Sequence, residues 1–164
     1  MSAAGTVAGI ETLRTTEPLT SILQADVARW RFEPSMLGGE RVSTRVLVAA
    51  VYRPPVLYNL PGPGEPPKDV GSVAADAPYP IVNPPPGYPA NALGDGVALV
   101  EVLVGTAGEV KAATVIQSTG AGFNPSAIQT ATQWRFRPAR RDGVPVPSFA
   151  YLVFGFRQPI TTRR

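Results

Sequence analysis

The chain of 164 residues contains no histidine and no cysteine. It therefore has no imidazole to act as a general base, no thiolate nucleophile and no disulfide, and the usual zinc and haem-thiolate sites are excluded. Lys68, Lys111 and the carboxylates show none of the spacings that catalytic motifs require. We predict a protein that is not an enzyme and that needs neither a cofactor nor a metal ion.

Charge and long apolar runs are scarce as well. Charged residues make up 16% of the chain, and 15 basic against 12 acidic residues give a net charge of +3. This mild excess, without an aromatic RNA-binding motif, predicts no nucleic-acid partner. No apolar run approaches the ~20 residues that span a bilayer, and residues 1–5 lack the basic start of a signal peptide. We expect contact with a membrane only through a segment outside this chain.

Proline is abundant and unevenly distributed. Twelve of the 19 prolines lie between positions 54 and 89. Proline has no backbone N–H to donate, so such a segment is not expected to form a central strand or a helix interior. We predict that residues 56–87 form an extended connector of polyproline type, which separates a lobe at residues 1–55 from a lobe at residues 88–159.

The two lobes share a repeated sequence. The motif Trp-Arg-Phe-Glu-Pro at positions 30–34 recurs as Trp-Arg-Phe-Arg-Pro at positions 134–138, which is an offset of 104 residues. Over a window of 26 residues this offset aligns eight identical pairs, among them both tryptophans. Composition alone does not produce such a match, and we interpret the two lobes as copies of one unit.

Each copy has the pattern of a strand, a helix and a second strand. The periodicity predicts strands over 7–13 and 110–116, helices over 20–30 and 124–134, and last strands over 42–52 and 146–156. Thr20 and Asn124 are predicted to cap the helices, with Pro125 in the first helical position. The helix face expected to pack on a sheet consists of Ile22, Val27 and Trp30 in the first copy, and of Ala127, Ile128, Ala131 and Trp134 in the second.

The last strands are predicted to present equivalent faces. In the first copy this face starts at Val42 and includes Val46, Val48 and Ala50, and in the second it starts at Val146. Only the second copy has a leading strand, over 97–104, joined to the next strand by a hairpin loop. The missing strand of the first copy has three candidate sources: residues 56–58, the other lobe or a second chain. We favour packing between the lobes, because a two-stranded unit buries too little alone.

The second copy carries a set of motifs that together point to a family. These are Tyr88-Pro89, Gly96-Val97, Gly108-x-Val110, Ile116-x-Ser118-Thr119-Gly120, the helix end Gln133-Trp134-Arg135-Phe136-Arg137-Pro138-Ala139 and Gly143-x-Pro145-Val146. Over residues 88–158 the sequence thereby resembles the TonB C-terminal domain of bacterial energy transducers. Residues 5–55 follow the same pattern without its first strand.

The resemblance implies an α+β fold with two TonB-like lobes, each a small antiparallel sheet backed by a helix and joined by the proline-rich connector. It also implies a periplasmic location and a partner that is an outer-membrane transporter or another envelope protein. In this family a short extended segment of the partner pairs beside the last strand, as an exposed strand edge allows. The alternative is an assembly module whose edge strands pair with its own copies, as in a homodimer.

The binding site implied by the resemblance lies on the last strand. We expect the hairpin strands 97–104 and 110–116 to pair with each other and to leave the last strand as the free margin. The expected partner-binding residues are Ser148, Phe149, Ala150, Tyr151, Leu152, Val153 and Phe154, together with Tyr88 and Pro89. Tyr88 and Pro89 have a second interpretation, in which they close the connector onto the lobe.

Two further groups of residues allow both a functional and a structural interpretation. Arginine side chains clamp anions well, and the candidates for such contacts are Arg135, Arg137, Arg140 and Arg141. Cations are also favoured at a solvated helix C-terminus, and this explains the cluster more simply. Trp30 and Trp134 could stack on a ligand, but an aromatic residue at the end of an apolar helix face is usually core.

Overall fold

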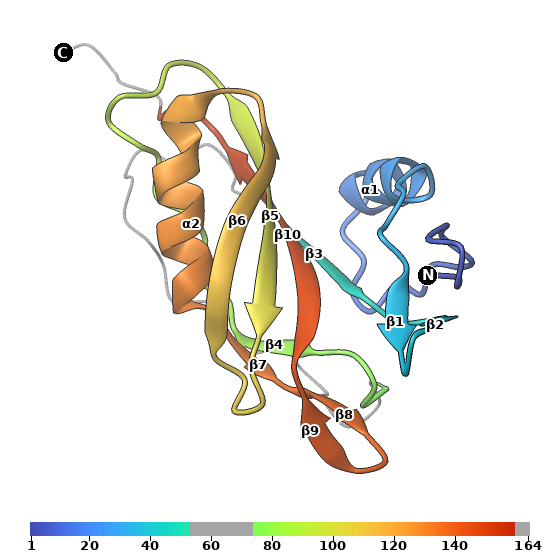
Figure 1. Ribbon diagram of the computed structural model, residues 1–164. Coiled ribbons are helices and arrows are strands. Elements are labelled where there is room, and N and C mark those ends of the chain that lie inside the picture. The colour runs from blue at the N-terminus through green and yellow to red at the C-terminus, as the bar shows by residue number, and fades with distance from the viewer. Residues whose placement is uncertain (53–73, 160–164) are drawn as a thin grey trace, which may run out of the picture. The chain divides into compact units, whose positions relative to one another are not determined.

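The computed structural model describes residues 1–52 and 74–159, and the chain divides into two compact units, Met1–Val46 and Leu47–Arg164. The structure is mixed α+β (Figure 1). The elements of the first unit are α1 (Leu19–Val27), β1 (Ser35–Leu37) and β2 (Glu40–Val42). Those of the second are β3 (Leu47–Tyr52), β4 (Tyr79–Val82), β5 (Gly96–Val104), β6 (Val110–Ser118), α2 (Asn124–Gln133), β7 (Arg135–Arg137), β8 (Ala139–Arg141), β9 (Val144–Val146) and β10 (Ser148–Phe156).

The second unit is built on a four-stranded sheet with the order β3-β10-β5-β6. The β5–β6 hairpin and the β10–β5 pair are antiparallel, whereas β3 runs parallel to β10. The predicted hairpin between the two strands is therefore confirmed. The expectation of purely antiparallel sheets is wrong, because the strand predicted as the end of the first copy lies in the sheet of the second unit.

Helix α2 covers one face of this sheet and lies along β6 and β5 (Figure 1). Alternate residues of β5, from Ala98 to Val104, are fully buried beneath it, as the strand period of two requires. The remaining core residues are mostly aromatic or small, namely Leu47, Ala92, Phe123, Ala127, Ala131, Trp134, Phe136, Ala150, Leu152, Phe154 and Phe156. The expected roles of Ala127, Ala131 and Trp134 as core residues are confirmed, but Ile128 is 37% exposed.

The end of the predicted connector belongs to the second unit. Residues 79–82 form β4, which pairs with β7, and Pro78 and Pro86 are fully buried. The Trp134 indole N–H donates to the carbonyl of Pro84 at 3.1 Å. Proline keeps its carbonyl acceptor and its apolar ring, so a proline-rich segment can pack on a domain without donating to it. The interpretation of residues 74–87 as a separate connector is wrong, and residues 56–73 of that prediction lie outside the described residues.

The first unit contains less regular structure than predicted. Residues 7–13, all of them described, form no strand, and only an isolated bridge joins Thr6 to Arg31. Helix α1 ends at Val27, which is buried, but Ile22 is 54% exposed. The predicted helix face does not pack on a sheet within this unit, because its only sheet is the β1–β2 hairpin.

Neither predicted helix cap forms. Thr20 lies inside α1, and its hydroxyl oxygen accepts a hydrogen bond from the backbone N–H of Thr16 at 2.7 Å. Asn124 is the first residue of α2 and follows a 3-10 turn over Ala121–Phe123, which continues directly into the helix. Pro125 does occupy the start of α2, where its missing donor costs nothing.

The two units contain the same local turn. Gly108 has φ of +85°, and its carbonyl accepts from the N–H of Phe136 at 2.8 Å. Gly5 has φ of +77°, and its carbonyl accepts from the N–H of Phe32 at the same distance. A Cβ at Gly108 would lie 1.8 Å from the Phe136 carbonyl oxygen, and one at Gly5 would lie 2.0 Å from that of Phe32. Both positions therefore require glycine.

The hairpins that follow also match. Ser35 pairs with Val42 in β1–β2, and Ala139 pairs with Val146 in β8–β9, at positions exactly one repeat offset later. Both turns have two consecutive residues with positive φ, Gly38-Gly39 in the first hairpin and Asp142-Gly143 in the second. Such turns fit the right-handed twist of a two-residue hairpin.

Candidate functional site

Strand β10 lies inside the sheet, between β5 and β3. It pairs with β5 from Ser148 to Phe156, and its other edge pairs with β3 from Ala150 to Gly155. The expectation that the last strand forms a free margin therefore does not describe this structure. The sequence identified the strand correctly but could not show that a segment 103 residues earlier would occupy its edge.

The residues expected to bind a partner alternate between the two faces of β10. Ala150, Leu152 and Phe154 are fully buried in the core beneath α2. Phe149, which is 49% exposed, and the half-buried Tyr151 lie on the opposite face with Val153. Ser148 precedes the β3 pairing, and its buried hydroxyl has no hydrogen-bond partner in the described part of the chain. A strand added at the edge of β10 would pair with the backbone of these residues, whichever face their side chains occupy.

Strand β3 places its residues in register with β10. Leu47, Ala49 and Val51 lie beside Ala150, Leu152 and Phe154, and they pack against the core. The face predicted for this strand, with Val48 and Ala50, is directed away from the core. Leu47 pairs with Ala150, 103 positions later, whereas the repeat offset is 104, and this shift of one residue places the other set of β3 side chains on the core face.

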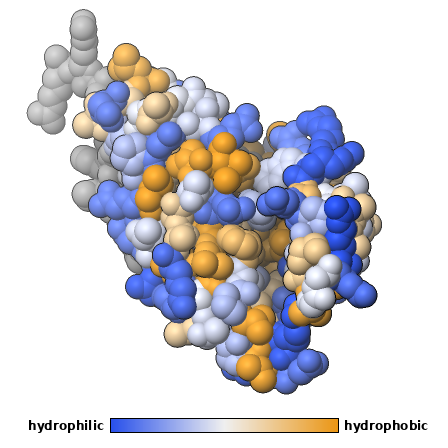
Figure 2. Space-filling view, viewed as in Figure 1, coloured by the Kyte–Doolittle hydropathy of each residue, from blue (hydrophilic) through white to orange (hydrophobic). Residues whose placement is uncertain are grey.

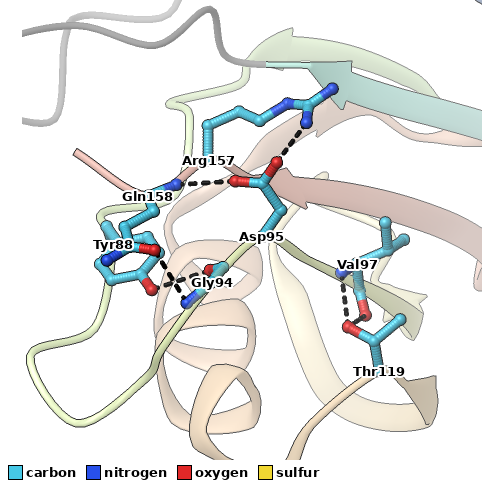
Figure 3. Close-up of polar contacts among 7 residues, drawn as sticks. All are labelled: Tyr88, Gly94, Asp95, Val97, Thr119, Arg157 and Gln158. Atoms are coloured by element: carbon cyan, nitrogen blue, oxygen red, sulfur yellow. Dashed lines mark hydrogen bonds and ion pairs between the residues drawn. The ribbon is translucent and has the colours of Figure 1, made fainter. Parts of the chain in front are cut away.

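The C-terminal end of β10 is fastened to the loop that precedes β5. The Asp95 carboxylate accepts a hydrogen bond from the backbone N–H of Gln158 at 3.0 Å and forms an ion pair with Arg157 (Figure 3). The Gln158 side chain in turn accepts from the N–H of Gly94 at 3.1 Å. These hydrogen bonds to Asp95, the backbone one foremost, lower the pKa of its carboxyl group. The sequence did not predict these contacts of Asp95, because the residue belongs to no recognisable motif.

Tyr88 and Pro89 belong to the same end of the unit. The Tyr88 hydroxyl donates to the Gly94 carbonyl at 2.8 Å (Figure 3), and its ring meets that of Phe123 edge to face at 6.1 Å. Pro89 is half-buried, and its carbonyl accepts from the N–H of Ala92. These contacts fit the structural interpretation, in which the two residues close the loop onto the core.

The candidate arginines make separate contacts in this structure. The guanidinium groups of Arg135, Arg137 and Arg140 donate to backbone carbonyls of three different segments, at Trp134, Ala74 and Gly143. Arg137 also lies 5.9 Å above the ring of Tyr79. Arg141 is exposed in the β8–β9 hairpin. Three of the four guanidinium groups thus donate hydrogen bonds within the unit.

The sheet face opposite α2 is partly apolar. Figure 2 shows hydrophobic side chains gathered over the sheet, interrupted by polar ones. Val97, Ile116 and Phe149 are among the exposed large hydrophobic residues. On this face the Tyr151 hydroxyl donates to the Glu101 carboxylate at 2.9 Å, which ties β10 to β5.

Within the described residues, 1–52 and 74–159, no group of three or more histidine, cysteine, aspartate or glutamate side chains is placed to hold a metal ion. No helix there is both long enough and apolar enough to cross a bilayer.

Part of the second unit is similar to a known protein family. Residues 84–157 match the family model of the Gram-negative bacterial TonB protein C-terminal domain. The solution NMR structure of the Pseudomonas aeruginosa TonB CTD is 27% identical in sequence to the matched part of the chain and superposes with a TM-score of 0.41. The match covers 53% of this chain and 90% of the Pseudomonas aeruginosa chain. No curated protein matches the chain significantly.

Proposed function

We propose that this chain is a non-enzymatic, periplasmic protein-interaction domain of TonB type. It binds an extended segment of an envelope protein by strand addition at the outer edge of β10, and the partner is an outer-membrane transporter in energy transduction. The match of residues 84–157 to the TonB C-terminal family supports the class of function.

The observation that carries strand addition is the β3–β10 pair itself. Six residues, Leu47–Tyr52, come from far along the sequence and pair in parallel with Ala150 to Gly155. The edge of β10 therefore has the geometry to receive an extended segment through backbone hydrogen bonds, with side-chain sites at alternate positions.

We also propose that residues 1–55, of which the structure describes 1–52, are a truncated duplicate of the TonB-like unit. The glycine turns at Gly5 and Gly108 and the two hairpins support this, since they match in register as well as in sequence. In this duplicate β3 corresponds to the last strand of the unit, β10. It lies beside its own counterpart rather than in a sheet of the first copy.

A peptide titration tests the proposed function. The 15N-labelled full chain is titrated with a peptide from the extended periplasmic segment of an outer-membrane transporter. We expect chemical-shift changes at the amides of 148–155 and 47–52, because these backbones form the edge. Shifts confined to residues 135–141, with the amides of β10 unmoved, would replace strand addition by an electrostatic contact at the arginines.

A second candidate function is an assembly module that pairs with its own copies. The observation in its favour is that β3, one outer strand of the sheet, is six uncharged residues long, whereas edge strands are commonly protected by charge. Sedimentation of the full chain over a range of concentrations separates the two, because the assembly function requires a concentration-dependent dimer or larger species.

A further inference from the structure

The edge that the proposed function requires is already filled by the chain itself. Strand β3 pairs with six residues of β10, whereas β5 pairs with nine on the other side. Leu47 is 9% exposed and Val48 to Val51 are only half-buried, in contrast to the fully buried alternate residues of β5. The pair β3–β10 is thus the shorter and less buried of the two that hold β10.

The chemistry of β3 shows what this edge accepts. Leu47, Ala49 and Val51 pack against the core, beside the fully buried Ala150, Leu152 and Phe154. Val48 and Ala50 lie on the opposite face, where burial is incomplete. A charged side chain at a core-side position would be buried without a partner, whereas at an outer position it would remain in water.

We propose that β3 is a built-in substitute for the partner's segment and must leave β10 before that segment binds. The partner's segment accordingly has the same chemistry: about six residues, apolar at the alternate core-side positions and added parallel to β10. This inference rests on the proposed function and adds to it a competing strand and a sequence preference.

A reversible cross-link tests displacement. Ala50 pairs with Val153 away from the core cluster, and register partners on neighbouring strands lie about 4.8 Å apart, within disulfide range. Because the chain has no cysteine, the A50C/V153C variant forms this one disulfide. The probe is a peptide of residues 46–53 of this chain. We expect reduced protein to bind it and oxidised protein to bind at least tenfold more weakly.

A matched control distinguishes the effect of holding β3 on β10 from the effect of oxidation itself. Leu103 and Ala112 are register partners on β5 and β6, remote from β3 in the strand order. Oxidised and reduced L103C/A112C should bind the peptide equally. Equal affinity of oxidised and reduced A50C/V153C would overturn displacement by β3 and leave binding at another edge in place.

A second variant weakens β3 instead of locking it. Consecutive N–H groups of a strand point to opposite sides, so A49P/A50P removes one donor directed at β10. We expect this variant to bind the peptide at least tenfold more tightly than the wild type. Binding to both with equal affinity would overturn the competition alone, and binding to neither would overturn strand addition as well. To test whether the second unit stays folded, W30F is added to the A49P/A50P variant, so that tryptophan fluorescence reports the burial of Trp134 alone.

Peptide variants test the sequence preference. Replacement of Leu47 by Glu in the peptide places a charge against the core and should lower affinity at least tenfold. Replacement of Val48 by Glu places the same charge on the outer face and should leave affinity within about twofold. Equal losses for the two peptides would show that the edge does not read alternate side chains.

Discussion

The two units carry the same turn and hairpin but differ in what they bury. Trp134 is fully buried, meets Phe154 edge to face at 5.8 Å and donates its indole N–H to Pro84. Trp30, in the same sequence motif, is only half-buried and meets Phe32 at 6.1 Å. The difference is the sheet, because β5, β6 and β10 lie beneath α2 whereas α1 has no such sheet in its unit.

This contrast separates local from tertiary determinants. The glycine turn and the hairpin form in both units, since a few residues and their backbone hydrogen bonds define them. Burial of the tryptophan requires strands that only the second unit possesses. A helix gains most of its stability in a protein from packing of its apolar face, and Val27 is the one buried residue of α1.

The largest expected effect distinguishes the two tryptophans. Trp134→Ala removes a fully buried aromatic side chain and should destabilise the second unit by about 3–5 kcal/mol. Trp30→Ala removes a half-buried one and should cost about 1 kcal/mol. Urea denaturation followed by the amide signals of β5 and β10, and separately by those of β1 and β2, measures each unit. Similar costs at the two sites would contradict the assigned role of the sheet.

The glycine turns should respond alike in both units. Gly108→Ala and Gly5→Ala each force a Cβ into a carbonyl oxygen at positive φ, and each should cost about 2 kcal/mol or more. Gly9→Ala is the control, because a Cβ there meets nothing within 4 Å. Denaturant midpoints of the three variants give the comparison, and tolerance of alanine at Gly5 alone would show that the first turn is not the same structure.

A smaller effect is expected from a substitution that makes the turn of the first hairpin more similar to that of the second. Gly38 has φ of +60°, and Asp142, at the equivalent place in the β8–β9 turn, has φ of +50°. Gly38→Asp should therefore fit the turn and stabilise it by about 0.5 kcal/mol, mainly by restricting the unfolded chain. Slower hydrogen exchange of the β1 and β2 amides would confirm this, and faster exchange would refute it.

The smallest expected effect concerns Asp95, a residue of the second unit without a counterpart in the first. Its pKa is lowered in the folded chain by the Gln158 N–H and by Arg157, so its contribution to stability is present above the ordinary pKa of about 3.9 and is lost as the pH falls through the lowered value. Asp95→Asn should slightly lower the Tm at pH 7 and leave it unchanged at a pH below both values. Equal Tm differences at the two pH values would exclude the carboxylate charge as the cause.

The sequence predicts local structure better than it predicts strand partners. Short sequence patterns predict the β5–β6 hairpin, the core role of Trp134 and the place of Pro125 in the first turn of α2. Such patterns do not predict which segment occupies the β10 edge, since Leu47 and Ala150 become neighbours only when the chain folds. The uncharged run of β3 was a usable signal, because such a strand is expected inside or against a sheet.

The β3–β10 pair also has a consequence for the order of folding. The β5–β6 hairpin closes a loop between Val104 and Val110, whereas β3 closes one of 103 residues, from Leu47 to Ala150. Long-range parallel contacts form slowly, because the chain must lose the entropy of closing the loop before the contacts stabilise it. We expect β3 to dock last, which pulse-labelled hydrogen exchange would detect as late protection of its amides. Each newly made chain would then pass through an interval in which the edge of β10 is open to whatever extended segment is nearby.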